Sequence, residues 1–217
     1  MSRDRGKIIE IIRVFRLAAA RGFVSGTEGN GSIRTEEGIY VTRSGVSKGL
    51  LEPEDVLLVG EDGKLIDGEG DPTSELPTHL EIYRVRPDVR AVFHAHPPYS
   101  TAYTLLEEKF PLREVAELLL VAGEVPVVPY ALPSSRDLAD KVSGYAGESD
   151  VLLLERHGVI GLGSSILDAY LKVEMTESVL KTMMIARQVG KTTPLPEEEV
   201  ERILHMRRVL KKGKELP

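Results

Sequence analysis

The spacing of apolar residues divides this chain into helical and extended segments. From about residue 4 to residue 21, apolar positions such as Ile8, Ile12 and Phe15 recur every three to four residues, which is the period of a helix with one buried face. Shorter apolar runs, among them Val151 to Leu154, are typical of buried strands. Glycine, proline, asparagine and aspartate separate these segments and mark the turns.

The same pattern predicts helices and strands in alternating order. Helices are expected at about residues 4–21, 76–85, 99–106, 113–122, 135–145, 164–189 and 197–211, and strands at about residues 32–34, 39–42, 56–59, 64–66, 89–95, 125–128, 151–154 and 159–162. Hairpins near both ends of this series exclude a purely parallel, doubly wound sheet. With no internal repeat and no long linker, residues 1–217 are expected to form a single α/β domain with a mixed sheet in layers.

Composition narrows the class of protein. Hydrophobic residues make up 41% and charged residues 29%, as in an ordinary globular protein, and the net charge of −6 gives no basic footprint for nucleic acid or an anionic membrane. Lysine and arginine gather in residues 202–214 at helical spacing, which indicates a solvated helix face. No stretch approaches the ~18 apolar residues of a membrane helix, and residues 1–5 do not begin a signal peptide, so a cytoplasmic protein is expected.

The chain contains no cysteine. This excludes disulfides, thiolate metal sites and cysteine nucleophiles, so a metal ion would have to be bound by imidazole and carboxylate groups. A serine nucleophile has no support either, because the G-x-S-x-G pattern is missing. A lysine Schiff base is not excluded, but no lysine lies in an apolar strand.

Two histidines at the end of an apolar strand are the first candidate for chemistry. His94 and His96 are separated by one residue, so in a strand both imidazoles point to one face and can reach one ion. His157 follows another apolar strand, and Glu75 precedes the helix before the histidine strand. Zinc sites without cysteine typically combine three histidines with a carboxylate or water. His79 and His205 fall on predicted helix surfaces among charged residues and are interpreted as ordinary histidines.

Three loops rich in small residues are the second candidate. Backbone amides and hydroxyls of such loops can hold a phosphate, although each loop alone is more typical of a turn, and neither a Walker loop nor a dinucleotide fingerprint occurs. Arg43 and Lys48 could add positive charge nearby. The three loops contain the pairs Gly29-Asn30, Ser44-Gly45 and Thr73-Ser74.

Five motifs in order resemble the class II aldolase/adducin family, and within it the branch of fuculose-phosphate aldolases. They are residues 27–34 (TEGNGSIR), 41–45 (VTRSG), 72–75 (PTSE), 94–96 (HAH) and 157–160 (HGVI), and the resemblance extends from about residue 8 to residue 190. It implies a three-layer αβα sandwich around a mixed, mostly antiparallel sheet. It also implies a homotetramer with active sites between subunits.

The resemblance further implies a lyase reaction and the groups that perform it. A phosphorylated ketose would be cleaved into, or condensed from, dihydroxyacetone phosphate and a small aldehyde, through an enediolate stabilised by one Zn²⁺ per subunit. Glu75 would leave the metal and act as the base. The implied zinc ligands are Glu75, His94, His96 and His157, and the implied phosphate ligands are Gly29, Asn30, Ser44, Gly45, Thr73 and Ser74.

Two departures from the family pattern bear on the substrate. Residues 110–119 contain no tyrosine where fuculose-phosphate aldolases carry a catalytic one, so Glu114 or Glu117 becomes a candidate acid, weighed against a pair of solvated helix glutamates. No tyrosine follows Tyr170 either. The alternatives are a ribulose-5-phosphate 4-epimerase, a methylthioribulose-1-phosphate dehydratase or a non-catalytic adducin-like module. The epimerases and dehydratases usually carry an aromatic-Thr-Trp-Gly run after the last histidine, and this chain has no tryptophan, which favours the aldolase.

Overall fold

One eight-stranded sheet organises the fold in the computed structural model, which describes residues 4–147 and 149–211. Its strand order is β4-β3-β2-β1-β5-β8-β7-β6, and every pairing is antiparallel except that of β6 with β7. The strands are β1 (Asn30–Arg34), β2 (Ile39–Thr42), β3 (Val56–Val59), β4 (Leu65–Asp67), β5 (Ala91–Ala95), β6 (Val127–Val128), β7 (Val151–Leu154) and β8 (Gly158–Gly163). The predicted mixed, mostly antiparallel sheet is therefore confirmed.

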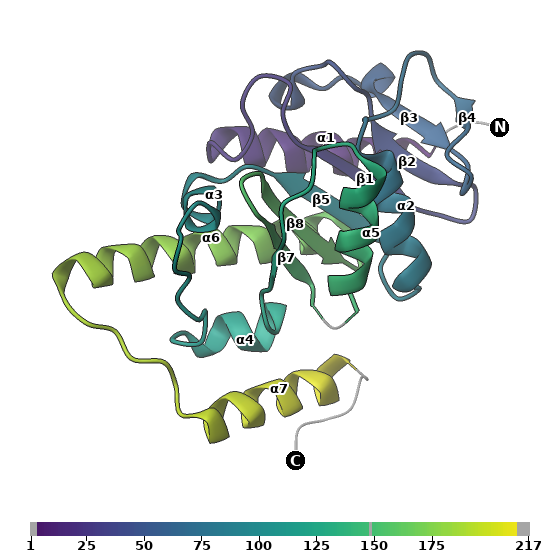
Figure 1. Ribbon diagram of the computed structural model, residues 1–217. Helices are drawn as coiled ribbons and strands as arrows, with labels where there is room; N and C mark the ends of the chain where they lie inside the picture. The colour runs from purple at the N-terminus through teal and green to yellow at the C-terminus, as the bar shows by residue number, and fades with distance from the viewer. Residues whose placement is uncertain (1–3, 148, 212–217) are drawn as a thin grey trace.

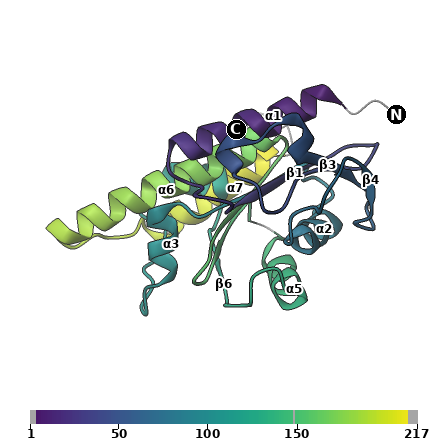
Figure 2. The ribbon, with the colours of Figure 1, turned by 90° about the horizontal axis from the view of Figure 1, so that it is seen from above.

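Helices cover both faces of this sheet (Figures 1 and 2). In Figure 2, α1, α6 and α7 lie on one side, and α2 and α5 lie on the other, which gives the three layers of an αβα sandwich. The helices are α1 (Arg5–Ala20), α2 (Leu76–Val85), α3 (Pro98–Thr104), α4 (Ala116–Ala122), α5 (Arg136–Tyr145), α6 (Ile166–Val189) and α7 (Glu197–Lys211), with 3-10 turns η1 (Lys48–Leu50) and η2 (Pro53–Asp55).

Both faces of the central strand β5 are buried, which explains why its apolar residues follow one another without alternating with polar ones. Its Phe93 belongs to the core shared with α1 and α6, where its ring centroid lies 5.2 Å from that of Phe15 and 5.5 Å from that of Tyr170. Its Val92 belongs to the other core, with Ile82 of α2. Because helices pack on both faces, successive residues of the strand are all buried.

One predicted helix begins later than the sequence indicated. Helix α4 starts at Ala116, whereas the apolar pattern predicted a start near Arg113. The Arg113 carbonyl accepts a hydrogen bond from the Leu195 amide (2.9 Å), and its guanidinium binds Glu124 and Glu197. These contacts with distant parts of the chain hold residue 113 outside the helix.

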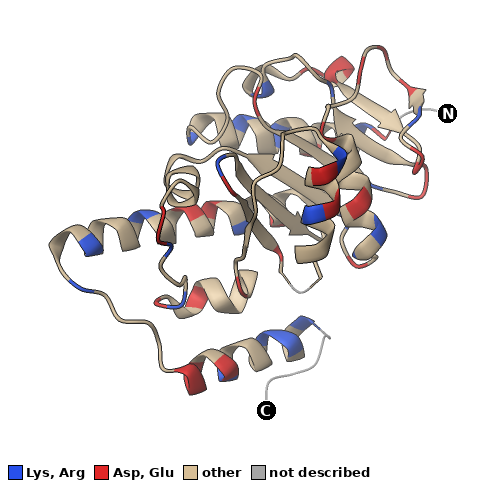
Figure 3. Ribbon diagram, viewed as in Figure 1, with Lys and Arg blue, Asp and Glu red and all other residues tan. Residues whose placement is uncertain are grey.

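Basic residues (blue in Figure 3) lie along the C-terminal helix α7, and their contacts show that not all of them are solvated. Arg207 is buried and its Nη2 donates to Asp150 Oδ2 (2.7 Å), while Lys211 Nζ donates to Asp150 Oδ1 (2.7 Å). Arg86 adds a third ion pair to the same carboxylate (3.0 Å). The predicted fully solvated face was therefore wrong at Arg207, which anchors α7. The rest of the predicted basic cluster, residues 212–214, and residues 1–3 at the N-terminus lie outside the described residues.

Within the described ranges, no helix combines the length and the apolar character needed to cross a membrane.

Candidate metal centre

Two strand ends bring the three predicted histidines together. His94 is in β5 and His96 follows that strand. His157 lies in the tight turn between β7 and β8, and β8 pairs with β5. One nitrogen of each imidazole lies within 4.8 Å of those of the other two, and the Nε2 atoms of His94 and His96 are 3.0 Å apart. The side-chain spacing predicted from sequence is confirmed, although β5 ends at Ala95, before His96.

Glu75 supplies the carboxylate of this cluster. It precedes α2 and is buried, with no cap bond from its side chain to the helix. Its Oε2 lies 3.2 Å from His94 Nε2, and its Oε1 lies 3.5 Å from His157 Nε2. The structure therefore brings Glu75 together with the histidines that the sequence grouped with it.

The donor set fits a divalent cation such as Zn²⁺. A tetrahedral zinc ion with bonds of about 2.0–2.1 Å would hold its ligand nitrogens roughly 3.3 Å apart. The 3.0 Å between the Nε2 atoms of His94 and His96 is close to that value, and all three histidines offer nitrogens within 4.8 Å of one another. Burial lowers the pKa of the His94 imidazole well below its ordinary value, and His96 and His157 lower that pKa further. Burial also lowers the pKa of His157. Both rings are therefore neutral near pH 7, as metal ligands must be.

The backbone fixes which His94 nitrogen faces the cluster. Its Nδ1 donates to the carbonyl oxygen of Val159 (3.0 Å), which leaves the Nε2 lone pair pointing toward Glu75 and His96. A metal-binding histidine commonly donates its other N–H to such a carbonyl, which orients the ring. Among the described residues, the buried Nδ1 of His157 has no hydrogen-bond partner.

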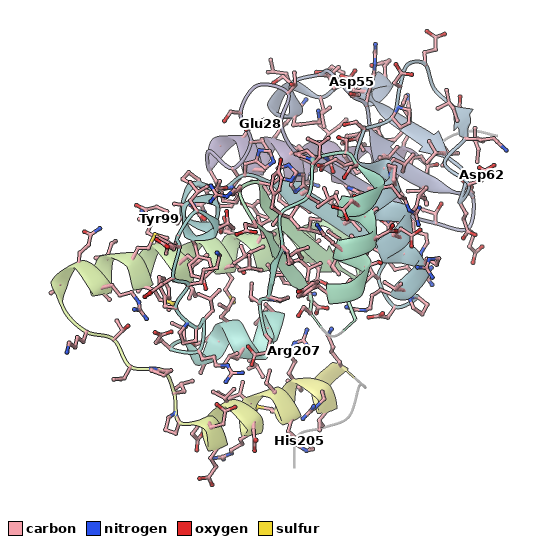
Figure 4. All side chains as sticks on the ribbon, viewed as in Figure 1. Glu28, Asp55, Asp62, Tyr99, His205 and Arg207 are labelled. Carbon is pink, nitrogen blue, oxygen red and sulfur yellow. The ribbon has the colours of Figure 1, made fainter. Side chains whose placement is uncertain are left out.

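Glu28 joins the cluster, a residue that sequence reasoning missed. It lies in the loop between α1 and β1 (labelled in Figure 4), and its Oε2 is 3.4 Å from Nδ1 of His96. If a metal ion bound Nε2 of His96, the proton of this ring would be on Nδ1. The Glu28 carboxylate faces that Nδ1 and could accept its hydrogen bond. A half-exposed glutamate in a glycine-rich loop gives no signal in the sequence by which it could have been found.

Gly158 allows the imidazoles to pack this closely. A Cβ atom at this position would lie 2.4 Å from His96 Cδ2 and 2.5 Å from the Ala95 carbonyl oxygen. We expect Gly158→Ala to weaken Zn²⁺ binding by about 10- to 100-fold. We also expect it to lower the free energy of unfolding by about 1–3 kcal/mol. A competitive zinc titration and urea unfolding would measure these effects.

The matched control is Gly144→Ala in α5, where a Cβ would meet nothing within 4 Å. That variant should bind zinc normally and gain up to about 1 kcal/mol of stability from the better helix propensity. Equal zinc affinities in the two variants would contradict the packing argument.

The three predicted phosphate loops also converge. Arg43 and Pro72 form an isolated antiparallel bridge, and the Ser44 amide donates to the Asp71 carbonyl (2.9 Å), so the second and third loops run side by side. Gly29 has a φ of 75°, and a Cβ there would lie 2.9 Å from the carbonyl oxygen of His94, so the first loop approaches the histidine strand closely.

Individual phosphate candidates differ in their present partners. Ser74 Oγ lies 2.7 Å from Oγ of Ser134, whose backbone has a positive φ of 64°. Thr73 Oγ1 accepts from the Glu75 amide (3.4 Å). A Cβ atom added at Gly45 would meet nothing within 4 Å, so the backbone of Gly45 borders open space.

Lys48 ties the first two loops together. Its ammonium donates to the carbonyl oxygens of Thr27 (3.1 Å) and Val46 (2.8 Å). The side chain is buried, and burial lowers its pKa. The predicted positive charge thus lies beneath these loops, and it also holds them in place.

His79 is not the surface histidine that the sequence suggested. It is buried, with 1% of its surface exposed, and its Nε2 lies 2.7 Å from Oδ1 of Asn30. The earlier interpretation was wrong because the helical pattern gave no sign that this face of α2 packs on the polar end of β1. His205 is exposed on α7, as expected.

The two candidate acids of residues 110–119 lie apart from the histidines in the described chain. Glu114 Oε1 accepts from Arg187 Nη2 (2.8 Å) and from Thr192 Oγ1 (3.3 Å), so its carboxylate contacts the end of α6 and the loop that follows. Glu117 is exposed in the first turn of α4.

Comparison with known proteins identifies the family. Residues 9–184 match the family described as Class II Aldolase and Adducin N-terminal domain. The chain belongs to the class II aldolase and adducin family. The sheet with its histidine cluster is therefore a version of this family's fold, as the five motifs indicated.

Relatives within the family differ in the reaction that they are named for. An L-fuculose phosphate aldolase of Methanococcus vannielii is 38% identical over 183 residues, covering 84% of this chain and 98% of the relative. A 5-deoxy-D-ribulose 1-phosphate aldolase of Bacillus thuringiensis is 33% identical, covering 89% and 92%. A 3-oxo-tetronate 4-phosphate decarboxylase of Haemophilus influenzae is 30% identical, covering 88% and 92%.

Solved structures agree with this placement. The L-fuculose-1-phosphate aldolase of Thermus thermophilus superimposes with a TM-score of 0.75 at 30% identity, over 87% of this chain and all of that one (100%). A further L-fuculose 1-phosphate aldolase reaches a TM-score of 0.85 at 28% identity, covering 93% and 96%.

Proposed function

We propose that this protein is a metal-dependent aldolase that cleaves or forms a phosphorylated ketose, with dihydroxyacetone phosphate and a small aldehyde as the other partners. One observation carries the proposal: the carboxylate of Glu75 lies within 3.5 Å of two of the three clustered histidines. A carboxylate that can act as a base, next to a group of imidazoles able to hold a Lewis acid, supports this reaction. The sugar-phosphate aldolases among its relatives support the same reaction class.

His94, His96, His157 and Glu75 would hold the metal, with Zn²⁺ as the ion that best suits imidazole and carboxylate ligands. When bound, such an ion stabilises negative charge that develops on substrate oxygens. Glu75 accepts the proton at the carbon next to the carbonyl and returns it in the reverse direction. Its position between two imidazoles lets the carboxylate change partners over a short distance.

The loops would bind the substrate's phosphate. Backbone and side-chain groups of Gly29, Asn30, Ser44, Gly45, Thr73 and Ser74 are the proposed ligands, and the buried ammonium of Lys48 favours an anion there. Holding the phosphate aligns the reacting carbons with Glu75, which contributes orientation. We further propose a cytoplasmic homotetramer, in which Glu117 or Glu114 of a neighbouring copy serves as the acid.

Zinc dependence and a panel of phosphorylated ketoses test this function together. We expect condensation of dihydroxyacetone phosphate with glycolaldehyde or lactaldehyde. Chelation should lower the rate by at least ~100-fold, since Lewis-acid stabilisation contributes several kcal/mol, and Zn²⁺ should restore it. Product chromatography and metal analysis by mass spectrometry would measure both.

The same panel separates the alternatives. An epimerised pentose phosphate would indicate the 4-epimerase, a dehydrated product from methylthioribulose phosphate would indicate the dehydratase, and carbon dioxide from a 3-oxo acid phosphate would indicate a decarboxylase. Less than a small fraction of one metal equivalent after reconstitution would instead favour a non-catalytic, adducin-like module.

A further inference from the structure

A chain of four buried side chains leads from the inner face of α2 to the Glu75 carboxylate. The hydroxyl of Tyr83 lies 2.8 Å from Ser32 Oγ, and Ser32 Oγ lies 2.7 Å from His79 Nδ1. His79 Nε2 lies 2.7 Å from Asn30 Oδ1, and Asn30 Nδ2 donates to Glu75 Oε2 at 2.9 Å. All five residues are buried, so water does not compete for these bonds.

The chemistry of Glu75 fixes the direction of every bond in this chain. An ionised carboxylate only accepts hydrogen bonds, so the amide nitrogen of Asn30 must face it. The Asn30 oxygen then faces His79, whose Nε2 must carry the proton. The bare Nδ1 accepts from the Ser32 hydroxyl, and Ser32 in turn accepts from Tyr83. Each donor along this path therefore has one acceptor.

We propose that His79 is a positioning residue for this enzyme: its Nε2–H holds the Asn30 amide so that the NH₂ group faces the Glu75 carboxylate.

An asparagine side chain can otherwise rotate by half a turn and present its oxygen instead. Oxygen facing the carboxylate would be repulsive, and Glu75 would lose the donor that fixes its Oε2 beside His94. With the proton on its Nε2, the neutral imidazole opposes this rotation, because the rotated amide would turn its NH₂ group toward another N–H donor. Burial keeps His79 in that form, because it lowers the pKa of the imidazole to about 4. The inference deepens the proposed function and rests on it for the catalytic readout.

Two amide substitutions separate positioning from a merely structural role. In His79→Gln the terminal NH₂ stands where Nε2–H stood and can still donate to Asn30. In His79→Asn the shorter amide reaches Ser32 instead and leaves Asn30 without its donor. Both remove the ring and bury an amide. Asparagine lacks one methylene group of glutamine, so it loses more packing, and urea unfolding of the two variants measures that difference.

We expect His79→Asn to lower kcat at least ~10-fold, with the KM for the ketose phosphate changed less than about 3-fold. It should also weaken Zn²⁺ binding about 10- to 100-fold, as is typical when a residue that orients a metal ligand is replaced. His79→Gln should stay within about 3-fold of the unsubstituted protein on all counts, because it keeps the donor to Asn30. Equal losses in both variants, or a change confined to KM, would overturn the proposal. Urea unfolding of both variants shows whether each is folded.

A readout that needs no activity separates this inference from the proposed reaction. Long-range ¹H–¹⁵N spectra of the zinc-loaded protein, labelled at histidine, report which nitrogen of His79 carries the proton. We expect the Nε2–H tautomer, and a Nδ1–H tautomer would overturn the positioning role. If no ketose phosphate is cleaved, the proposed function fails while the tautomer and zinc-affinity measurements still decide the role of His79.

Discussion

Glu75→Gln is expected to lower the rate of ketose-phosphate cleavage by at least ~10³-fold while the protein still binds a divalent cation. A positioned general base contributes about 10²- to 10⁴-fold, and an amide cannot accept the substrate's proton. The three histidines remain as ligands, and glutamine has nearly the same volume, so the cluster keeps its shape. Steady-state kinetics with reconstituted enzyme and a zinc titration would measure the two effects separately.

The control for this variant is Glu81→Gln. Glu81 lies in α2, the helix that Glu75 precedes, but its carboxylate binds Arg84 (2.7 Å) and Arg136 (2.6 Å) rather than the histidines. Its replacement should leave turnover within about 3-fold, because its two partners are largely exposed arginines and it contacts none of the histidines. Near-normal turnover in Glu75→Gln would refute the role of Glu75 as the base.

His96→Ala should have the other large effect, and should act through the metal. Removing one of three clustered imidazoles is expected to weaken Zn²⁺ binding by more than ~100-fold, beyond the effect of removing a residue that only orients a ligand. Activity should fall in parallel and recover in part at high zinc concentration. Metal content of the dialysed protein and activity as a function of added Zn²⁺ would test both statements.

His205→Ala is the matched control for His96→Ala, since His205 is exposed on α7, on the opposite side of the molecule from Glu28 in Figure 4. It should bind one equivalent of zinc with unchanged affinity. Full metal content in His96→Ala with normal activity would remove this imidazole from the site. Loss of activity with full metal content would reassign it from metal binding to substrate contact.

Local patterns predicted most of the secondary structure. The helix expected at residues 76–85 is α2, and the strand expected at residues 39–42 is β2. Side-chain period, proline positions and N-cap serines such as Ser135 and Ser165 are all read within a few neighbouring residues. The late start of α4 was missed because its cause is a contact between Arg113 and residues 195–197.

The sequence by itself determined the histidine pair. Two imidazoles one residue apart at a strand end must lie close together in any fold that keeps the strand, and with no cysteine present only imidazole and carboxylate ligands were possible. The position of His157, Glu75 and the three small-residue loops in the chain made them further candidates, and the resemblance to the family then implied their roles as zinc and phosphate ligands.

The tertiary structure alone decided which groups surround that pair. His79 was interpreted as an ordinary surface residue, yet pairing of β1 with β5 and packing of α2 on the sheet bring it to Asn30, 49 positions away in the chain. In the same way, Glu28 reaches His96, and Asp150 binds both Arg86 and Arg207. Residue spacing fixes which way a side chain points from its own element. Strand order and helix packing fix what it meets there, because those contacts join segments that no local pattern connects.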